Sequence, residues 1–156
     1  MKKNVIGVLI AGLLLCSNLL TAQTEMVWDS YGLGFTLTKG MRITQNDGET
    51  FSAEKADLFL TIVPVKNREV TEEHLAEAVI EMAVEMNYQT IADADELELN
   101  DLYGYYVEGT SDGASAFVVA LMDVESSNNY LAIVVFTPDT RDAAIDLIIS
   151  FFAYDE

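Results

Sequence analysis

The chain has 156 residues, of which 26 are acidic, 8 are basic and 1 is a cysteine, so its formal net charge is −18. Nucleic acid is excluded as a partner because phosphate binding needs clustered lysine and arginine, and the basic residues are scattered. An anionic membrane surface is disfavoured for the same reason. Cationic partners and divalent ions are compatible with the charge.

Residues 1–22 have the pattern of a bacterial secretory signal peptide. Two lysines precede an apolar run over residues 5–20, and residues 21–23 are small or polar. We expect cleavage after Ala22 and export to the periplasm or the extracellular space, rather than a retained membrane anchor. Lipidation of Cys16 is not expected, because Leu15 stands where lipoprotein signals have a small residue.

Residues 23–156 are predicted to form one α+β domain. Removal of residues 1–22 leaves 134 residues with no cysteine, 6 basic and 26 acidic side chains, and a net charge of −20. A disulfide framework is therefore excluded, and this length suffices for one hydrophobic core. The high charge favours a soluble, monomeric protein with no membrane span.

Strands are predicted before the first helix. Residues 26–31 form only a short apolar lead-in, and alternating or apolar segments follow at 35–37, 41–45, 49–53 and 58–65. Asn46-Asp47-Gly48 is a tight-turn signal that pairs the second segment with the third as a hairpin. Pro64 marks the end of the fourth segment or an edge position.

A helix is predicted over residues 70–87, with Thr71 as its N-cap. We expect this helix to lie across a sheet and to organise the rest of the chain. Val70 could pack on Leu75 as a hydrophobic staple. The predicted buried stripe follows the helical period and consists of Leu75, Val79, Met82, Ala83 and Met86, widened by Ala76 and Ile80.

The second half of the chain is predicted to be a strand meander closed by a helix. Residues 89–99 could form a strand or an extended loop, and strands are expected at 102–109, 114–124 and 130–136. Pro138 and Asp139 begin the last helix, with a buried stripe of Ala144, Leu147, Ile148, Phe151 and Phe152. The predicted fold is α+β, with an antiparallel sheet of about six to seven strands and two main helices in the order βββ-α-ββββ-α.

This element order resembles the superfamily of PsbP-like proteins and Ran-release factors. The similar local patterns are Phe35-Thr36-Leu37 leading to Lys39-Gly40, and Ile148-Ile149-Ser150-Phe151 near the end. Many members have a proline before the first glycine and a tryptophan after it, where this chain has Thr38 and Met41. The resemblance implies an antiparallel sheet flanked by helices and, in most members, a non-catalytic binding or assembly role. It transfers no functional residue.

One short motif matches the nucleophile elbow of hydrolases. Residues 109–113, GTSDG, match G-x-S-x-G, but that motif requires a following helix and a later histidine. A strand is expected after Gly113, and His74, the only histidine, comes earlier. A hairpin turn through Asp112-Gly113 is the better interpretation. We therefore expect no hydrolase, and no cofactor, because glycine-rich phosphate or dinucleotide motifs are also absent. The chain is expected not to be an enzyme; an enzyme that uses only carboxylates would require two acids facing each other in a cleft.

Two acidic clusters are candidate binding features. The first, Asp93, Asp95, Glu96, Glu98 and Asp101, offers the oxygen ligands that calcium prefers, but it lacks the spacing of an EF-hand loop. A solvated charge run is the simpler interpretation. The second consists of Glu73, Glu77, Glu81 and Glu85. Their spacing of four residues forms an acidic ridge along one side of the predicted helix. It is either a solvated face or a recognition ridge for a basic partner, and in both cases added salt should stabilise the fold.

Aromatic residues provide the last candidate site. Trp28, Tyr31, Tyr103, Tyr105 and Tyr106 could line a cleft for a small apolar ligand, although alternating tyrosine is also ordinary strand chemistry. The sequence therefore predicts an exported cell-envelope domain that is a non-catalytic binding or assembly module. The alternatives are a carrier of a small apolar ligand or a calcium-binding domain.

Overall fold

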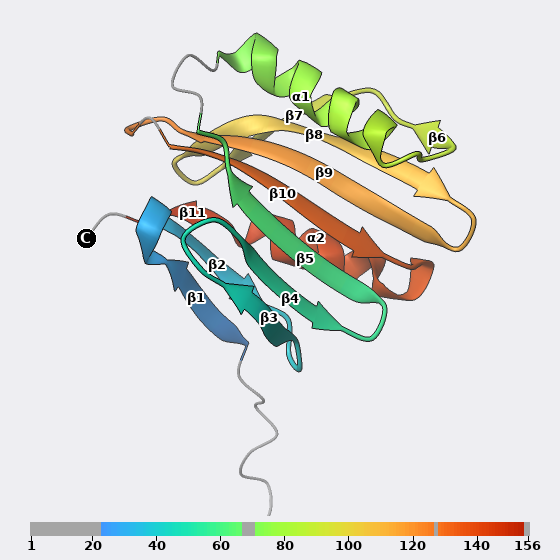
Figure 1. Ribbon diagram of the computed structural model, residues 1–156, viewed down its shortest axis with the longest axis horizontal. Coiled ribbons are helices and arrows are strands. Elements are labelled where there is room, and N and C mark those ends of the chain that lie inside the picture. The colour runs from blue at the N-terminus through green and yellow to red at the C-terminus, as the bar shows by residue number, and fades with distance from the viewer. Residues whose placement is uncertain (1–22, 67–70, 127, 155–156) are drawn as a thin grey trace, which may run out of the picture.

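The computed structural model describes residues 23–66, 71–126 and 128–154 of the chain. These residues form an eight-stranded sheet, a three-stranded sheet and two α-helices (Figure 1). Every strand pair is antiparallel. The predicted α+β class is confirmed, and the strands exceed the predicted number.

The large sheet has the order β3-β4-β5-β10-β9-β8-β6, with β7 also paired to β8. Its strands are β3 (Arg42–Asn46), β4 (Phe51–Lys55), β5 (Leu58–Pro64), β6 (Thr90–Ile91), β7 (Asp95–Leu99), β8 (Leu102–Ser111), β9 (Ala114–Asp123) and β10 (Asn129–Phe136). The predicted hairpin of β3 and β4 and the meander of β8, β9 and β10 are confirmed. The segment 89–99, which the sequence left open between a strand and a loop, contains two strands that both pair with β8.

The small sheet contains two strands that the sequence did not predict. It has the order β1-β2-β11, with β1 at Thr24–Trp28, β2 at Leu33–Leu37 and β11 at Phe152–Ala153. Its last strand pairs with Gly34 and Leu33, and a Cβ on Gly34 would meet the Phe152 ring at 2.1 Å. A two-residue strand has no periodicity of its own, so only this pairing defines it.

The first helix, α1, spans Glu72–Glu85 and begins after Thr71, as predicted. The Thr71 N–H donates to His74 Nδ1 at 3.3 Å, so His74 takes the place that Glu or Gln has in a capping box. Asn87, with a φ of 59°, adopts the left-handed conformation just beyond the helix end. The predicted staple through Val70 lies outside the described residues. Ile80 does not widen the buried stripe, because it is 42% exposed.

The second helix, α2, is shorter than predicted. Pro138–Thr140 form a 3-10 turn, η2, and α2 spans Arg141–Ile149. Ser150 Oγ donates to the Leu147 carbonyl at 2.7 Å and accepts from the Thr36 N–H at 2.9 Å. These bonds end the helix and lead the chain into β11. Phe151 is buried beyond the helix, as expected for a core residue, whereas Phe152 belongs to the strand.

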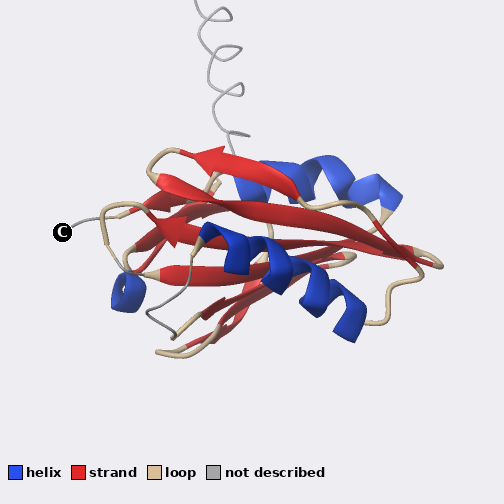
Figure 2. Ribbon diagram, turned by 90° about the horizontal axis from the view of Figure 1, so that it is seen from above, coloured by secondary structure: helices blue, strands red, loops and turns tan. Residues whose placement is uncertain are grey.

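The elements form three layers, with the large sheet in the middle. Figure 2 shows α1 and α2 on opposite sides of the strands. The larger core lies between the large sheet and the layer formed by α2 and the small sheet. A smaller core lies under α1. The sequence favoured α1 as the organising element, but most buried side chains lie on the opposite face. No described helix is long and apolar enough to cross a membrane.

Candidate binding groove

Helix α1 covers only part of its face of the large sheet. It packs on β8 and β9, where Leu75, Val79 and Ala83 are buried against Val107, Val118 and Ala120. The predicted stripe thus contacts the sheet through its centre, while Met82 and Met86 lie partly buried at its border. In Figure 1 the sheet continues beyond α1 through β10, β5 and β4, and no described helix covers these strands on the α1 side.

The uncovered strands carry apolar side chains on the same face as α1. Leu131 of β10 pairs with Ala120 of β9, and paired residues of antiparallel strands point to the same side of a sheet. Across β10 and β5, Leu131 pairs with Val63 and Val135 pairs with Phe59. We call the half-buried or exposed residues on this face the apolar strip: Phe59, Val63, Leu131, Ile133 and Val135.

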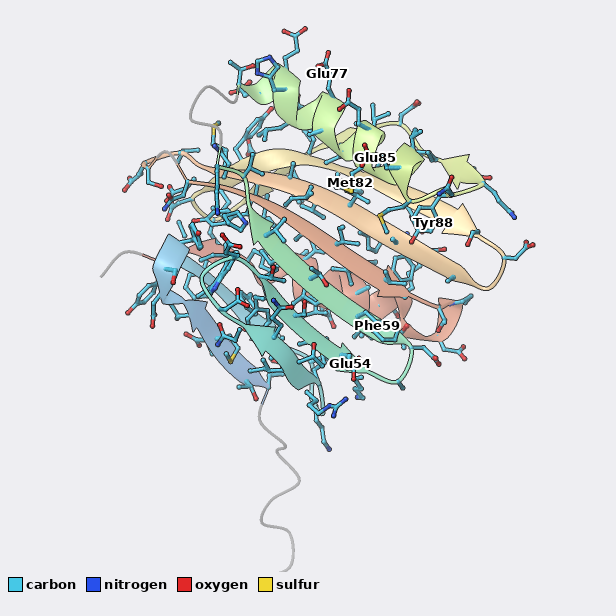
Figure 3. All side chains as sticks on the ribbon, in the orientation of Figure 1. Glu54, Phe59, Glu77, Met82, Glu85 and Tyr88 are labelled. Carbon is cyan, nitrogen blue, oxygen red and sulfur yellow. The ribbon has the colours of Figure 1, made fainter. Side chains whose placement is uncertain are left out.

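A groove of about 470 Å³ lies along α1 and reaches the apolar strip at Leu131. Ala120, Leu131 and Val65 contribute to its floor, and α1 forms a wall. The helical wall consists of His74, Leu75, Glu77, Ala78, Glu81, Met82 and Glu85. Figure 3 shows Met82 and Glu85 on the side of α1 that borders the open strands, with Phe59 and Glu54 further along the same face. The groove therefore combines an apolar floor with an acidic wall.

In the part of the chain that the structure describes, the glutamates of the acidic wall form no ion pair. The ion pairs recorded there are Arg42–Glu54, Lys66–Glu49 at 2.8 Å and Arg141–Glu108 at 2.9 Å. None of them includes Glu77, Glu81 or Glu85, and all three of these side chains are exposed. The spacing of four residues repeats the negative charge along the groove, so the wall presents a row of like charges.

The predicted acidic ridge is thus divided by the structure. Glu77, Glu81 and Glu85 border the groove, whereas Glu73 is exposed in the first turn and does not line it. Their spacing alone was enough to place these residues on one side of a helix. The apolar strip below them was not predicted, because the segments of β5 and β10 are apolar on both faces. Within β5, Thr61 was the only polar residue that could have indicated a face left uncovered.

The five aromatic residues expected to line one cleft lie in three places. Trp28 and Tyr31 contact each other and bond to the β3–β4 turn, with Trp28 Nε1 donating to the Asp47 carbonyl at 2.9 Å and Tyr31 Oη donating to the Gly48 carbonyl at 2.6 Å. The other three lie on β8 and point to both of its faces. A single cleft lined by all five residues is therefore not formed.

Alternation along β8 separates the three tyrosines. Tyr103 and Tyr105 lie on the α1 face, where their rings meet edge to face and Tyr103 Oη donates to Tyr105 Oη at 3.1 Å. This hydrogen bond raises the pKa of Tyr103 above its ordinary value. Tyr106 lies on the opposite face against Phe117, with ring centroids 6.3 Å apart.

The acids proposed as calcium ligands lie in β7 and in the segments just before and after it. Glu96 and Glu98 pair with Tyr105 and Tyr103 on the α1 face, whereas Asp95 pairs with Tyr106. Neighbouring acids of the strand therefore point to opposite sides. Among the described residues, which include all five of these acids, no three or more acidic, histidine or cysteine side chains gather as a metal ion would require.

The G-x-S-x-G segment forms the turn between β8 and β9. Ser111 pairs with Ala114 across the hairpin, and Gly113 has a φ of 81°, which favours glycine. The predicted hairpin turn is confirmed.

A second, smaller hollow of about 220 Å³ lies on the other face of the large sheet. It is lined by Leu97, Tyr106, Glu108, Phe117, Arg141, Ile145, Ile148 and Ile149. The Arg141 guanidinium lies 5.5 Å from the centre of the Phe117 ring and pairs with Glu108. The hydrogen bond to Glu108 raises the pKa of Arg141.

Two solved structures share this architecture. The Saccharomyces cerevisiae Ran-binding protein Mog1p is 7% identical, with 86% of this chain aligned to 97% of that chain and a TM-score of 0.55. A crystal structure from Bacteroides thetaiotaomicron is 8% identical, with a TM-score of 0.50, and 88% of this chain covers 50% of its length. No family model matches the chain, and a search of curated proteins finds no relative.

These likenesses place the chain in a fold class. The protein has the Mog1/PsbP-like fold, as its element order predicted. At such low sequence identity the likeness concerns the fold alone, and it assigns no function to a residue.

Proposed function

We propose that this protein is an exported, non-catalytic binding module of the cell envelope that holds a partner against the apolar strip beside α1. One observation carries the proposal: the strip runs along β5 and β10 next to α1 and stays half-buried or exposed, with Phe59 43% exposed. Contiguous apolar surface beside a polar border is typical of an interaction site. The proposal also agrees with Mog1p, which has the same fold and is a Ran-binding protein.

The proposed location rests on residues 1–22, whose pattern is that of a secretory signal. A binding module exported in this way would meet its partner outside the cytoplasm. The net charge of −20 after removal of the signal would keep the free module soluble, although it exposes an apolar strip.

Site-specific photo-crosslinking in the producing cells tests the proposal. A benzophenone amino acid replaces Phe59 in the strip or, as the matched control, Val124, an exposed apolar residue between β9 and β10 that lines neither hollow. We expect a discrete adduct of raised mass from position 59 that position 124 does not form. Identical adducts from both positions, or none from position 59, would contradict the proposal.

A carrier of a small apolar ligand is the second candidate function, and the hollow beside α2 favours it. Tyr106 and Phe117 provide aromatic walls. Leu97 and three isoleucines add apolar lining, and the Arg141–Glu108 ion pair adds a polar border. The volume of about 220 Å³ is below the range of drug-sized ligand sites, so only a small molecule would fit. Methyl NMR with toluene as the probe tests this function. Shifts of Ile145 and Ile148, with Ile133 unchanged, are expected of a carrier.

A further inference from the structure

The groove beside α1 has features that define the chemistry of its partner. This inference rests on the proposed function, because it assumes that the apolar strip is a binding surface. We propose that the partner is a basic amphipathic helix that lies alongside α1, with its apolar side on the strip and its lysine or arginine side chains against Glu77, Glu81 and Glu85.

The width of the open surface fits a helix. Strands lie about 4.8 Å apart, so β10 and β5 together present a strip roughly 10 Å wide. This is about the diameter of a helix with its side chains. On the neighbouring strands, β8 and β9, the sheet already holds a helix, α1, through small and apolar side chains. A second helix would thus continue a packing arrangement that this face of the sheet already has.

The length of the acidic wall sets the length of the partner. Helix α1 has 14 residues, which corresponds to about 21 Å at 1.5 Å per residue. Glu77, Glu81 and Glu85 occupy its last three turns. A partner helix of three to four turns, with basic residues four apart along one edge, would place one cation beside each glutamate.

An extended peptide fits the groove poorly. Strand addition needs an edge with unpaired backbone groups, and both strands of the strip are interior. Strand β5 pairs with β4 and β10, and β10 pairs with β5 and β9. Strand β3 ends the sheet on this side, and its residues do not line the groove. The groove can therefore offer side-chain contacts, which suit a helix.

The negative charge of the acidic wall favours a positively charged partner. An acidic segment would face three exposed glutamates that take part in no ion pair among the described residues. A second copy of the chain would bring two such walls together, and it carries the same net charge of −18. Both arrangements are repulsive. The lysine or arginine side chains of a basic segment would be attracted to these glutamates, and the segment would associate faster at low salt.

Binding of a designed peptide to the purified protein tests the inference. The probe is a helical peptide of about 16 residues with leucine on one face and lysines four apart along one edge. Two control peptides have the same composition in scrambled order, or glutamate in place of each lysine. Fluorescence anisotropy at low and moderate salt measures the dissociation constant.

Matched protein variants separate the groove from the general charge. The test variant carries Glu77→Gln, Glu81→Gln and Glu85→Gln. The control variant carries Glu25→Gln, Glu98→Gln and Glu125→Gln, three exposed residues that do not line the groove. We expect the test variant to bind the lysine peptide about tenfold more weakly and the control variant to bind as the wild type. Ile133→Ser should also weaken binding, because it removes apolar surface from the strip.

Several results would overturn the inference. The first is that the two triple variants bind the lysine peptide equally well. The second is that the scrambled or the glutamate peptide binds the protein as tightly as the lysine peptide does. The third is that the protein forms a dimer that the peptide dissociates. The last result would assign the groove to a second copy. If crosslinking at position 59 succeeds while the peptide fails, the proposed binding surface stands and only the partner's class is wrong. Thermal melts of each variant exclude unfolding as the cause of lost binding.

Discussion

The two faces of the large sheet differ in how completely they are covered. On one face, α2 and the small sheet cover the strands, and Phe35 and Phe51 meet edge to face with a centroid distance of 4.8 Å and almost no exposure. On the other face, α1 covers β8 and β9 and leaves Phe59 43% exposed. The closed face therefore provides most of the stability, and the open face leaves apolar side chains in contact with water.

The largest expected effect comes from truncating one phenylalanine on each face. Phe35→Ala on the closed face should lower the free energy of unfolding by about 3–5 kcal/mol, because it leaves a cavity in the core. Phe59→Ala on the open face should cost less than about 1 kcal/mol, because its side chain already contacts water. Urea unfolding measures both. Equal losses would mean that the open strip is part of the core.

A smaller effect should separate the two sides of α1. Val79 is fully buried against the sheet, whereas its neighbour Ile80 is 42% exposed. Val79→Ala should lower the free energy of unfolding by about 2 kcal/mol, since two methyl groups leave a packed site. Ile80→Ala should change it by less than about 0.5 kcal/mol. Urea unfolding is again the measurement, and a costly Ile80→Ala would show that α1 is held differently from the arrangement described here.

The acidic wall should cost the free protein a modest amount of stability. Neutralising Glu77, Glu81 and Glu85 removes like-charged neighbours four residues apart, and each such pair costs about 0.2–0.5 kcal/mol. The triple glutamine variant should therefore melt at a higher temperature than the wild type at low salt. Added salt should raise the melting temperature of the wild type more than that of the variant. A wild-type melting temperature that salt does not change would contradict this account.

The smallest effect concerns pH on the α1 face. The folded state raises the pKa of Tyr103 through its hydrogen bond to Tyr105, and burial raises the pKa of Tyr88. The unfolded tyrosines lose their protons near pH 10. Above that pH the unfolded state binds fewer protons than the folded state, so stability falls as pH rises. Urea midpoints at about pH 9 and pH 11 should show this fall, and Tyr103→Phe should make it shallower.

Sequence patterns predicted the long elements well. Helix α1 and strands β8, β9 and β10 have strong periodicity or long apolar runs, and the turns at Asp47-Gly48 and Asp112-Gly113 have distinctive chemistry. The acidic wall was also predictable, because a spacing of four places Glu77, Glu81 and Glu85 on one side of any helix. These features depend on residues close together in the chain.

The short strands and the boundary of the last helix were not predictable in this way. Strand β11 exists because Ser150 bonds to Thr36 and Phe152 lies over Gly34. The predicted aromatic cleft was wrong for a related reason. Alternation along β8 sends Tyr105 and Tyr106 to opposite faces, while Trp28 and Tyr31 are bound to a turn nearly twenty residues away in sequence.

By itself, the sequence determined the α+β class, the main helix with its cap and charged side, and the resemblance to the Mog1/PsbP-like fold. Periodicity, turn chemistry and charge spacing are local properties that each segment carries alone. Only the tertiary structure decided which face of each apolar strand is covered. That outcome depends on where α1, α2 and the small sheet pack, and on the fact that one helix is narrower than the sheet beneath it.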